Sequence, residues 1–467
     1  MAYKRIDNND ITALAAICGA ARVHSAGALS EDYSHDELNG LRHMPEVMVE
    51  PVSTHEVSEI MKYAHERNIP VTARGQGTGL VGGAVALYGG ILLNMCRMNR
   101  VVDLDEENLT LTVEPGVLLC DIYALVEGRG LFYPSNPGMK SATIGGNVST
   151  NAGGMSAVKY GVTRDYVRGL EVVLADGTVI QTGGKIAKNS SGYSLRDMFI
   201  GAEGTLGIVT KIVLRLIPLP SHSTTIVAAF TDLAAAIGAV PEIIKSKVVP
   251  RSMEFVEHDL IAAVEAYTGR DFPGADDGAG AYLLLMLDGC SPEAVLQDCG
   301  SVMGICSAMG AVGVKHVETE EHSRAIWSAR EKFSEAIRAS TTETEECDLV
   351  VPRSQVADFI LYMHRLEEKF GVRIKSYGHA GDGNLHLYIL RDRIEQDEWE
   401  KRLVLVFDCM YRRAEELGGQ ISGEHGIGFA KRRYLEETAG AAVMDIMHRI
   451  KTAMDPKGIL NPGKIVS

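Results

Sequence analysis

The sequence has no uninterrupted apolar run approaching the roughly 20 residues that a membrane-spanning helix requires. Its most apolar stretches, Ile226–Phe230 and Leu233–Val240, are short and are stopped by Asp232 and Pro241. The first residues contain a Lys4-Arg5 pair, but no apolar core of a secretion signal follows it. We therefore expect a cytoplasmic protein without a membrane span.

Positive charge is also scarce. Lys and Arg number 46 against 61 Asp and Glu, which gives a formal net charge of −15 at pH 7. Nucleic-acid binding needs clustered Lys and Arg to neutralise phosphates, so this charge excludes nucleic acid as an expected partner. An anionic substrate would need a local cationic site, because the global field repels it.

The eight cysteines contain no C-x-x-C pair and are scattered along the 467 residues. This distribution is typical of reduced, mostly buried thiols. It also lacks the clustered cysteines that hold an iron–sulfur centre. If the protein is a redox enzyme, its electrons must leave to an external acceptor.

The pattern of residues changes along the chain. Residues 51–219 are rich in glycine and in strand-like segments, whereas residues 220–393 alternate helical and strand patterns. Ser53–Arg67 is predicted to be a helix capped by Ser53 or Thr54, and Ile394–Leu417 is a second helix that Gly418 ends. We expect domains at residues 1–219 and 220–427, with residues 428–467 returning to the first domain.

Three glycine-rich segments lie within the first domain. They are residues 74–83 (RGQGTGLVGG), 137–154 (PGMKSATIGGNVSTNAGG) and 201–209 (GAEGTLGIV). Residues 77–82 match G-x-G-x-x-G, but a strand follows them where a dinucleotide fold would begin a helix. A single such loop could be a plain turn. Three together favour a large phosphate-bearing cofactor, because glycines let backbone amides approach phosphate oxygens.

These segments resemble the FAD-binding domain of the vanillyl-alcohol oxidase and p-cresol methylhydroxylase superfamily. From about residue 40 to its end, the chain is similar to the branch containing the FAD-linked component of glycolate oxidase, FAD-dependent D-lactate dehydrogenases and D-2-hydroxyglutarate dehydrogenase. The resemblance implies an α+β fold, with a two-lobed FAD-binding domain and a cap domain of antiparallel sheet and helices. It implies that FAD contacts Arg74, Gly75, Gln76, Gly77, Thr78, Gly79, Pro137, Gly138, Thr143, Gly146, Asn147, Asn151, Gly154, Glu203, Gly204, Gly207, Ile208, Val209 and Asn461. Relatives with covalent flavin often carry His in the first loop. Thr78 and Leu80 stand there in this chain, so we expect non-covalent FAD.

The second chemical motif contains His379 and His386, seven positions apart, with the hairpin-turn signal Asp382-Gly383 between them. A turn there can direct both imidazoles towards one point. Two His and one carboxylate form a common divalent-metal set, and satisfied histidines in turns are the structural alternative. The resemblance assigns His379, His386 and Glu424 as the metal ligands and His425 as the catalytic base. Zinc, iron(II) and manganese are all compatible with two His and a carboxylate.

The resemblance also places Arg330 opposite the substrate carboxylate. We expect Trp327–Ser334 to be one helix, so that Ser334, one turn on, shares the face of Arg330 and joins it as a catalytic residue, and Arg353 is the alternative cation. A metal would lower the pKa of the substrate hydroxyl, neutral His425 would take its proton, and flavin N5 would take the Cα hydride. The D-2-hydroxyglutarate branch carries a Lys just before the strand that corresponds to residues 348–351. Thr344-Glu-Glu-Cys-Asp348 has two acids there, which argues against a dicarboxylic substrate.

The sequence thus predicts an FAD- and metal-dependent dehydrogenase that oxidises a small D-2-hydroxy acid, D-lactate first, and passes electrons to a redox protein. That partner would be an electron-transferring flavoprotein or an iron–sulfur subunit. The alternatives are a glycolate-oxidising subunit of a larger complex, a non-catalytic flavin-binding subunit, and a metal-dependent hydrolase without redox chemistry.

Overall fold

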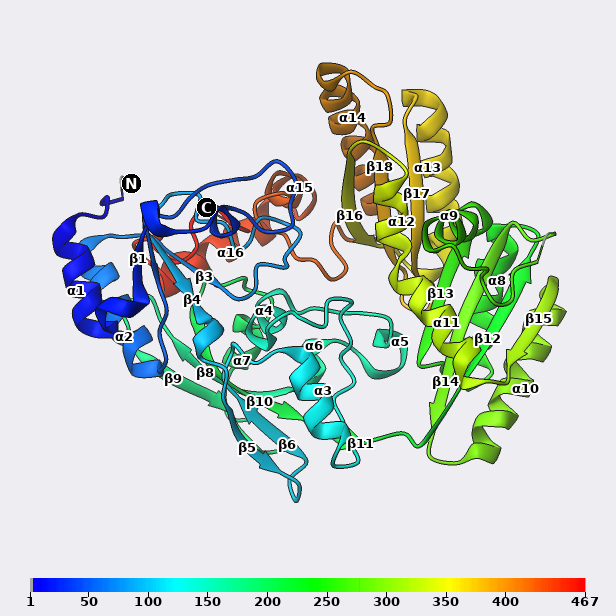
Figure 1. The fold of residues 1–467 in the computed structure, drawn as a ribbon, viewed down its shortest axis with the longest axis horizontal. Coiled ribbons are helices and arrows are strands. Elements are labelled where there is room, and N and C mark those ends of the chain that lie inside the picture. Colours follow the sequence, from blue (N-terminus) through cyan, green and yellow to red (C-terminus); the bar gives the residue numbers. More distant parts are fainter. Residues whose placement is uncertain (1–2, 277, 467) are drawn as a thin grey trace. The chain divides into compact units, whose positions relative to one another are not determined.

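The computed structural model describes residues 3–276 and 278–466, and its chain forms two compact units. Unit 1 comprises residues 1–153, 162–219 and 425–467, and unit 2 comprises residues 154–161 and 220–424. Both units combine helices with β-sheets, as expected for an α+β protein (Figure 1). None of the helices in the described ranges is both long enough and apolar enough to cross a bilayer.

Unit 1 contains a four-stranded sheet of order β1-β2-β4-β3 and a five-stranded antiparallel sheet of order β5-β6-β10-β8-β9. Its strands are β1 (Val23–Ser25), β2 (Val47–Val49), β3 (Val71–Arg74), β4 (Ile91–Asn94), β5 (Val101–Asp105), β6 (Thr110–Val113), β7 (Leu131–Phe132), β8 (Val167–Val173), β9 (Val179–Gly183), β10 (Ile208–Arg215) and β11 (Ile217–Pro218). Its helices are α1 (Asn8–Cys18), α2 (Thr54–Arg67), α3 (Leu119–Glu127), α4 (Ile144–Thr150), α6 (Thr163–Tyr166), α7 (Leu195–Phe199), α15 (Arg432–Thr438) and α16 (Ala441–Met454).

Helix α2 confirms the predicted helix and its cap. The Ser53 hydroxyl accepts the amide N–H of Glu56 at 3.3 Å, which satisfies one of the free donors at the helix start. The apolar face buries Val57, Ile60 and Ala64 in the core of the four-stranded sheet.

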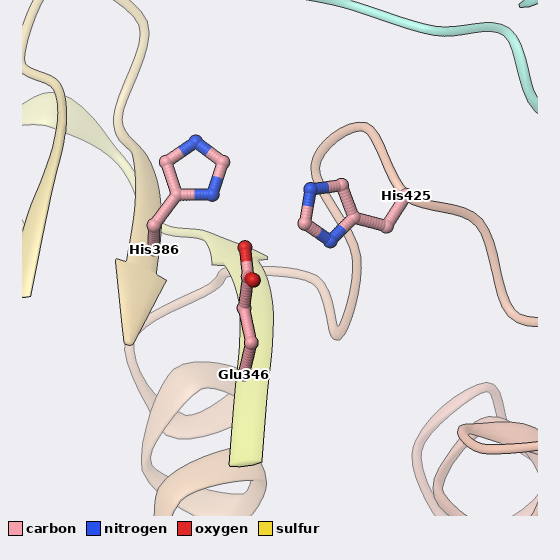
Figure 2. Close-up of side chains that lie close together, drawn as sticks. All are labelled: Glu346, His386 and His425. Atoms are coloured by element: carbon pink, nitrogen blue, oxygen red, sulfur yellow. The ribbon is translucent and has the colours of Figure 1, made fainter. Parts of the chain in front are cut away.

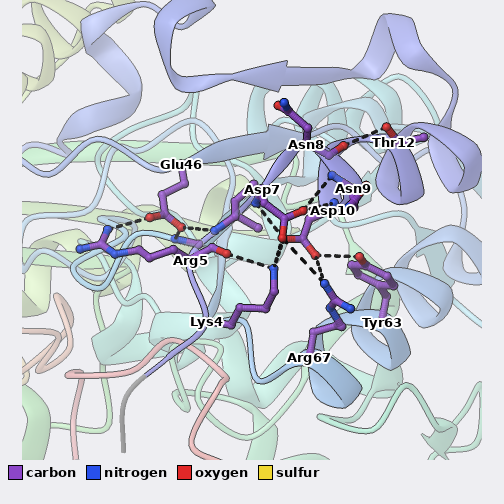
Figure 3. Close-up of polar contacts among 12 residues, drawn as sticks. Lys4, Arg5, Asp7, Asn8, Asn9, Asp10, Thr12, Glu46, Tyr63 and Arg67 are labelled. Carbon is purple, nitrogen blue, oxygen red and sulfur yellow. Dashed lines mark hydrogen bonds and ion pairs between the residues drawn. The ribbon is translucent and has the colours of Figure 1, made fainter.

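Polar contacts fasten α1 to α2 (Figure 3). The fully buried carboxylate of Asp10 accepts hydrogen bonds from Tyr63 at 2.7 Å and from Arg67 at 3.2 Å, and it also pairs with Lys4. These cations and donors satisfy a charge that would otherwise be costly to bury.

Unit 2 is built on a seven-stranded antiparallel sheet of order β15-β12-β14-β13-β17-β18-β16. Its strands are β12 (His222–Phe230), β13 (Ser252–Glu257), β14 (Ala281–Gly289), β15 (Ala311–Val317), β16 (Thr344–Val350), β17 (Arg373–His379) and β18 (Asn384–Leu390). Its helices are α5 (Ala157–Tyr160), α8 (Leu233–Lys245), α9 (His258–Thr268), α10 (Pro292–Ala308), α11 (Glu320–Glu331), α12 (Phe333–Ala339), α13 (Val356–Phe370) and α14 (Gln396–Glu416).

One face of this sheet packs its alternate side chains against α9, α11 and α12 in a continuous apolar core. Helices α8, α10, α13 and α14 also contact the sheet and, in pairs, one another. The antiparallel sheet with helices confirms the architecture expected for the cap domain (Figure 1).

The short segment 154–161 belongs to unit 2, which the sequence did not predict. Lys159 Nζ donates to the backbone carbonyl of Asp288 at 2.7 Å, and Tyr160 donates to its carboxylate at 2.9 Å. Because the Asp288 side chain is almost fully buried, these partners hold the segment firmly on unit 2.

Candidate functional site

The hairpin of β17 and β18 brings His379 and His386 together. Asn384 pairs with His379 and His386 pairs with Tyr377, so all four side chains lie on one face of the sheet.

The predicted turn at Asp382-Gly383 is confirmed. Gly383 has a φ of +85°, and an added Cβ would stand only 2.0 Å from the carbonyl of Val351. The turn therefore requires glycine.

Glu424 completes a cluster with the two histidines. Its Oε1 lies 3.3 Å from His386 Nε2 and 3.7 Å from His379 Nε2, and the two Nε2 atoms are 3.4 Å apart. Two ligands of a tetrahedral ion, each about 2.1 Å from it, would stand roughly 3.4 Å apart. The spacing and the donor set therefore fit a divalent metal.

Asp348 fixes the backbone that carries Glu424. This residue pairs with His386 in the sheet register, and its carboxylate accepts the amides of Gly423 at 2.6 Å and Glu424 at 2.7 Å. Asp348 has no exposed surface, so these donors satisfy a carboxylate that would otherwise be costly to bury. Asp348 thus holds the Glu424 end of the cluster in place.

Glu254 supports the cluster from the other side. It pairs with His379 in the register of β13 and β17, and its Oε1 lies 2.7 Å from His379 Nδ1. Burial alone would raise the pKa of Glu254, but His379 and Arg330 outweigh burial and hold this pKa below its ordinary value. Burial opposes the charge of His379 too, yet Glu254 and Glu424 raise the pKa of His379 well above its ordinary value.

A second carboxylate stands beside His386. Figure 2 shows Glu346 on β16 and His386 on the neighbouring strand β18, and their ligand-capable atoms lie within 4.8 Å of one another. Arg338 Nη2 donates to Glu346 at 3.0 Å. Glu346 is therefore an acidic group at the edge of the His379–His386–Glu424 cluster.

Arg330 lies close to this cluster and is buried. Its Nε and Nη2 donate to Glu254 Oε2 at 2.8 and 2.5 Å, and its guanidinium lies 4.5 Å from the ring centre of Tyr377. The predicted contact between Arg330 and substrate stays a prediction. Arg353 is exposed in a short 3-10 turn.

The prediction that Trp327–Ser334 forms one helix was wrong. Helix α11 ends at Glu331, Lys332 is a turn residue, and Ser334 belongs to α12. The break places Phe333 in the core, where its ring packs edge-on against Tyr377 at 5.5 Å. The assumed one-turn spacing between Arg330 and Ser334 therefore does not apply.

In unit 1, the first glycine-rich loop follows β3. The backbone amides of residues 76–79 donate to no other group in the described chain, so they are available to anionic oxygens. An added Cβ on Gly75 would stand 2.1 Å from Thr143 Oγ1 of the second loop, so the two loops pack closely. The side chain of Arg74, at the start of this loop, donates to the carbonyls of His35 at 2.7 Å and Asp32 at 3.0 Å.

The second loop forms helix α4, with Thr143 as its N-cap and Asn151 as its left-handed C-cap. The buried Nδ2 of Asn147 has no hydrogen-bond partner in the described structure, which is costly unless a ligand accepts from it. Pro137 and Gly138 precede the helix in a loop, and Gly154 falls in the segment that belongs to unit 2.

The third segment places Glu203 at a φ of +48° with its carboxylate buried. That carboxylate accepts the amides of Ile427 at 2.7 Å and Gly428 at 2.8 Å, just after His425 in the chain. Asn461 Nδ2 donates to the carbonyls of Gly83 at 2.9 Å and Glu203 at 2.8 Å. Glu203 and Asn461 thus tie the loops of unit 1 together.

The remaining residues of this segment lie around the start of β10. Gly204 has a φ of +71°, and an added Cβ on Gly207 would stand 2.6 Å from Val172 Cγ1. Ile208 and Val209 are buried strand residues. Their contact with a cofactor stays a prediction.

Sequence reasoning missed Glu254 and Asp348. Each is an acid within an otherwise apolar strand, in Met253-Glu254-Phe255 and Cys347-Asp348-Leu349. Acids are rarely buried unless they are paired, so this pattern was the available signal.

Comparison with known proteins agrees with these observations. Residues 45–183 match the family model "FAD binding domain", and residues 219–465 match "FAD linked oxidases, C-terminal domain". A D-lactate dehydrogenase of Anaerostipes hadrus is 42% identical over 95% of this chain and 94% of its own length. Glycolate oxidase subunit GlcD of Bacillus subtilis is 42% identical over 93% of this chain and 91% of its own length.

The fold also matches a solved structure. p-Cresol methylhydroxylase with substrate bound has a TM-score of 0.79 at 19% identity, over 98% of this chain and 97% of that one. This likeness confirms the predicted α+β fold of the vanillyl-alcohol oxidase type. With family models covering both halves of the sequence, the chain belongs to the family of FAD-linked oxidases and is an FAD-dependent oxidoreductase.

Proposed function

We propose that this protein oxidises a small D-2-hydroxy acid, D-lactate first, to the 2-oxo acid with the help of a divalent metal. The observation that carries the proposal is the cluster of the buried His379 and His386 with the partly buried Glu424 in an FAD-linked oxidase. A plain hydrolase would use such a cluster without flavin, and the FAD-binding family match removes the reason to prefer that alternative.

The cluster fits a metal better than a purely structural role. His379 and His386 are almost fully buried, and a ligand atom of Glu424 joins those of the β17–β18 hairpin within 4.8 Å. A zinc, iron(II) or manganese ion bound there would orient the substrate oxygens and favour ionisation of the hydroxyl. His379, His386 and Glu424 would hold it.

Two further residues would act on the substrate. Arg330 lies close to the cluster through Glu254 and would pair with the substrate carboxylate. His425, the next residue after Glu424, would take the hydroxyl proton, because a neutral imidazole can accept one near pH 7. Ser334 and Arg353 are weaker candidates, because the break at Lys332 removes the one-turn spacing between Arg330 and Ser334, and Arg353 is exposed in a 3-10 turn.

FAD fits the loops of unit 1 by two features, the available amides of residues 76–79 and the partnerless Asn147 Nδ2. When bound, FAD supplies the acceptor for the hydride that leaves the substrate Cα. We propose that it is held without a covalent bond, with contacts from the residues that the sequence analysis names in the three loops and from Asn461.

D-lactate is the first candidate substrate because one relative is named D-lactate dehydrogenase. Glycolate is the second, because a relative with the same 42% identity is named glycolate oxidase subunit GlcD. The acid Glu346 beside His386 disfavours a substrate with a second carboxylate. We further propose that the protein is cytoplasmic and that its electrons pass to a protein partner.

Anaerobic reduction of the flavin tests the proposal. The purified yellow protein, supplied with zinc, manganese or iron(II), is mixed with D-lactate, L-lactate, glycolate or D-2-hydroxyglutarate. We expect D-lactate to bleach the flavin absorbance fastest and D-2-hydroxyglutarate slowest. Faster bleaching by glycolate would favour the second candidate, and no bleaching by any 2-hydroxy acid would refute both.

A further inference from the structure

One buried carboxylate links the candidate metal ligand His379 to the candidate substrate cation Arg330. Glu254 has no exposed surface and stands directly opposite His379 in the strand register. Its Oε1 lies 2.7 Å from His379 Nδ1, and its Oε2 accepts from Arg330 Nε at 2.8 Å and Nη2 at 2.5 Å. Each oxygen therefore serves a different partner.

This contact determines which nitrogen of His379 carries the proton. An ionised carboxylate only accepts hydrogen bonds, so Nδ1 must be the donor. When the ring is neutral, its lone pair is then on Nε2, the atom that lies 3.4 Å from His386 Nε2. A carboxylate behind a metal-binding histidine typically fixes the ring orientation and increases its basicity as a ligand.

The same carboxylate orients Arg330. Two of its nitrogens are engaged by Glu254, while Nη1 has no hydrogen-bond partner in the part of the chain that the structure describes. The guanidinium also stacks 4.5 Å from the ring centre of Tyr377, which limits its rotation. Arg330 is thus held in place, with Nη1 left to donate to an anionic group.

We infer that Glu254 is a positioning residue that sets both the metal-binding nitrogen of His379 and the orientation of Arg330. This inference rests on the proposed function, because it requires a metal at His379. A merely structural ion pair would stabilise the sheet without affecting metal affinity or the His379 tautomer.

Metal titration of the flavin-loaded protein tests this role. After treatment with a chelator, the wild type, Glu254→Gln and the control Glu257→Gln are titrated with Co²⁺ against a competing chelator, and the cobalt absorbance is recorded. Glu257 lies on the same strand but contacts His364 at 3.3 Å and Ser376 at 3.4 Å. We expect Glu254→Gln to lower cobalt affinity about 10- to 100-fold and Glu257→Gln to leave it unchanged.

Tautomer and folding measurements separate the outcomes. In ¹⁵N-histidine NMR of the chelator-treated protein, recorded at a pH high enough to leave the His379 ring neutral, Glu254→Gln should reduce the Nδ1–H character of His379. If the wild type itself binds no cobalt, the proposed metal function fails. If the wild type binds and Glu254→Gln binds equally well, the positioning role is overturned. Should Glu254→Gln fail to fold, Glu254→Asp keeps the charge but withdraws it from His379, and wild-type affinity in that variant would also overturn the inference.

Discussion

The buried carboxylate of Glu203 accepts a 2.8 Å hydrogen bond from the backbone amide of Gly428. It holds Ile427 in the same way at 2.7 Å. Burial raises the pKa of Glu203 to about 7, although these two amides and the positive charges of Lys464 and Lys431 lower it. The acid therefore titrates near neutral pH in the folded protein.

Glu203 should make the stability of the folded protein depend on pH. Its unfolded pKa is near 4.5, so between pH 4.5 and 7 the folded state holds a proton that the unfolded state has lost. The stabilising contribution is complete below pH 4.5 and is lost as pH rises to about 7. It amounts to on the order of 3 kcal/mol.

Glu203→Gln removes this titration because its side chain stays neutral. Urea unfolding of the FAD-saturated protein from pH 5 to 8, followed by circular dichroism, should show the variant gaining stability relative to wild type as pH rises. Parallel pH profiles for the two proteins would contradict the assignment. The variant loses the carboxylate that accepts the amides of Ile427 and Gly428, and this loss can lower its free energy of unfolding by the same amount at every pH. Such a constant difference would not affect the comparison of the pH profiles.

Loss of one imidazole should remove the metal. His386→Ala leaves Glu424 and His379 without the third ligand atom, so we expect metal content and turnover to fall while FAD stays bound. His364→Ala, which removes a half-exposed histidine of the same unit, is the matched control. Metal analysis after gel filtration provides the measurement, and full metal content in His386→Ala would refute the ligand set.

The turn between His379 and His386 was predictable because Asp382-Gly383 is a local signal that needs no knowledge of tertiary structure. The contact of Glu254 with His379 was not predictable, since 125 residues separate the two and only the register of β13 and β17 brings them together. The break at Lys332 was missed for a similar reason. Burial of Phe333 in the core, a tertiary effect, overrides the helical spacing of residues 327–334.

His425→Ala tests the proposed base. If His425 takes the substrate proton, flavin reduction should slow by about 10²- to 10⁴-fold with FAD and metal still bound. His448→Ala, on α16, provides a histidine control outside the proposed chemistry. Stopped-flow absorbance under anaerobic conditions measures the rate, and a loss below about tenfold would assign the proton transfer to another group.

Acid precipitation should release the flavin. The first glycine-rich loop presents Thr78 and Leu80 and no histidine, so it offers no imidazole for a covalent link to FAD. We expect a colourless pellet and a yellow supernatant after trichloroacetic acid. A yellow pellet that yields a flavin-bearing peptide on digestion would show covalent attachment and identify the linking residue.

The reduced flavin should pass its electrons to another protein. The eight cysteines are free and scattered, and no metal-binding group among the described residues contains a cysteine, so an internal iron–sulfur relay has no support. A transient redox partner needs only a small contact, typically below about 1,200 Å², so an extensive apolar surface is not required. We expect air to reoxidise the reduced enzyme much more slowly than turnover, and an electron-transferring flavoprotein or a soluble dye to restore the full rate. Stopped-flow reoxidation measures both. Reoxidation by air at the turnover rate would make the protein an oxidase and would remove the need for a partner.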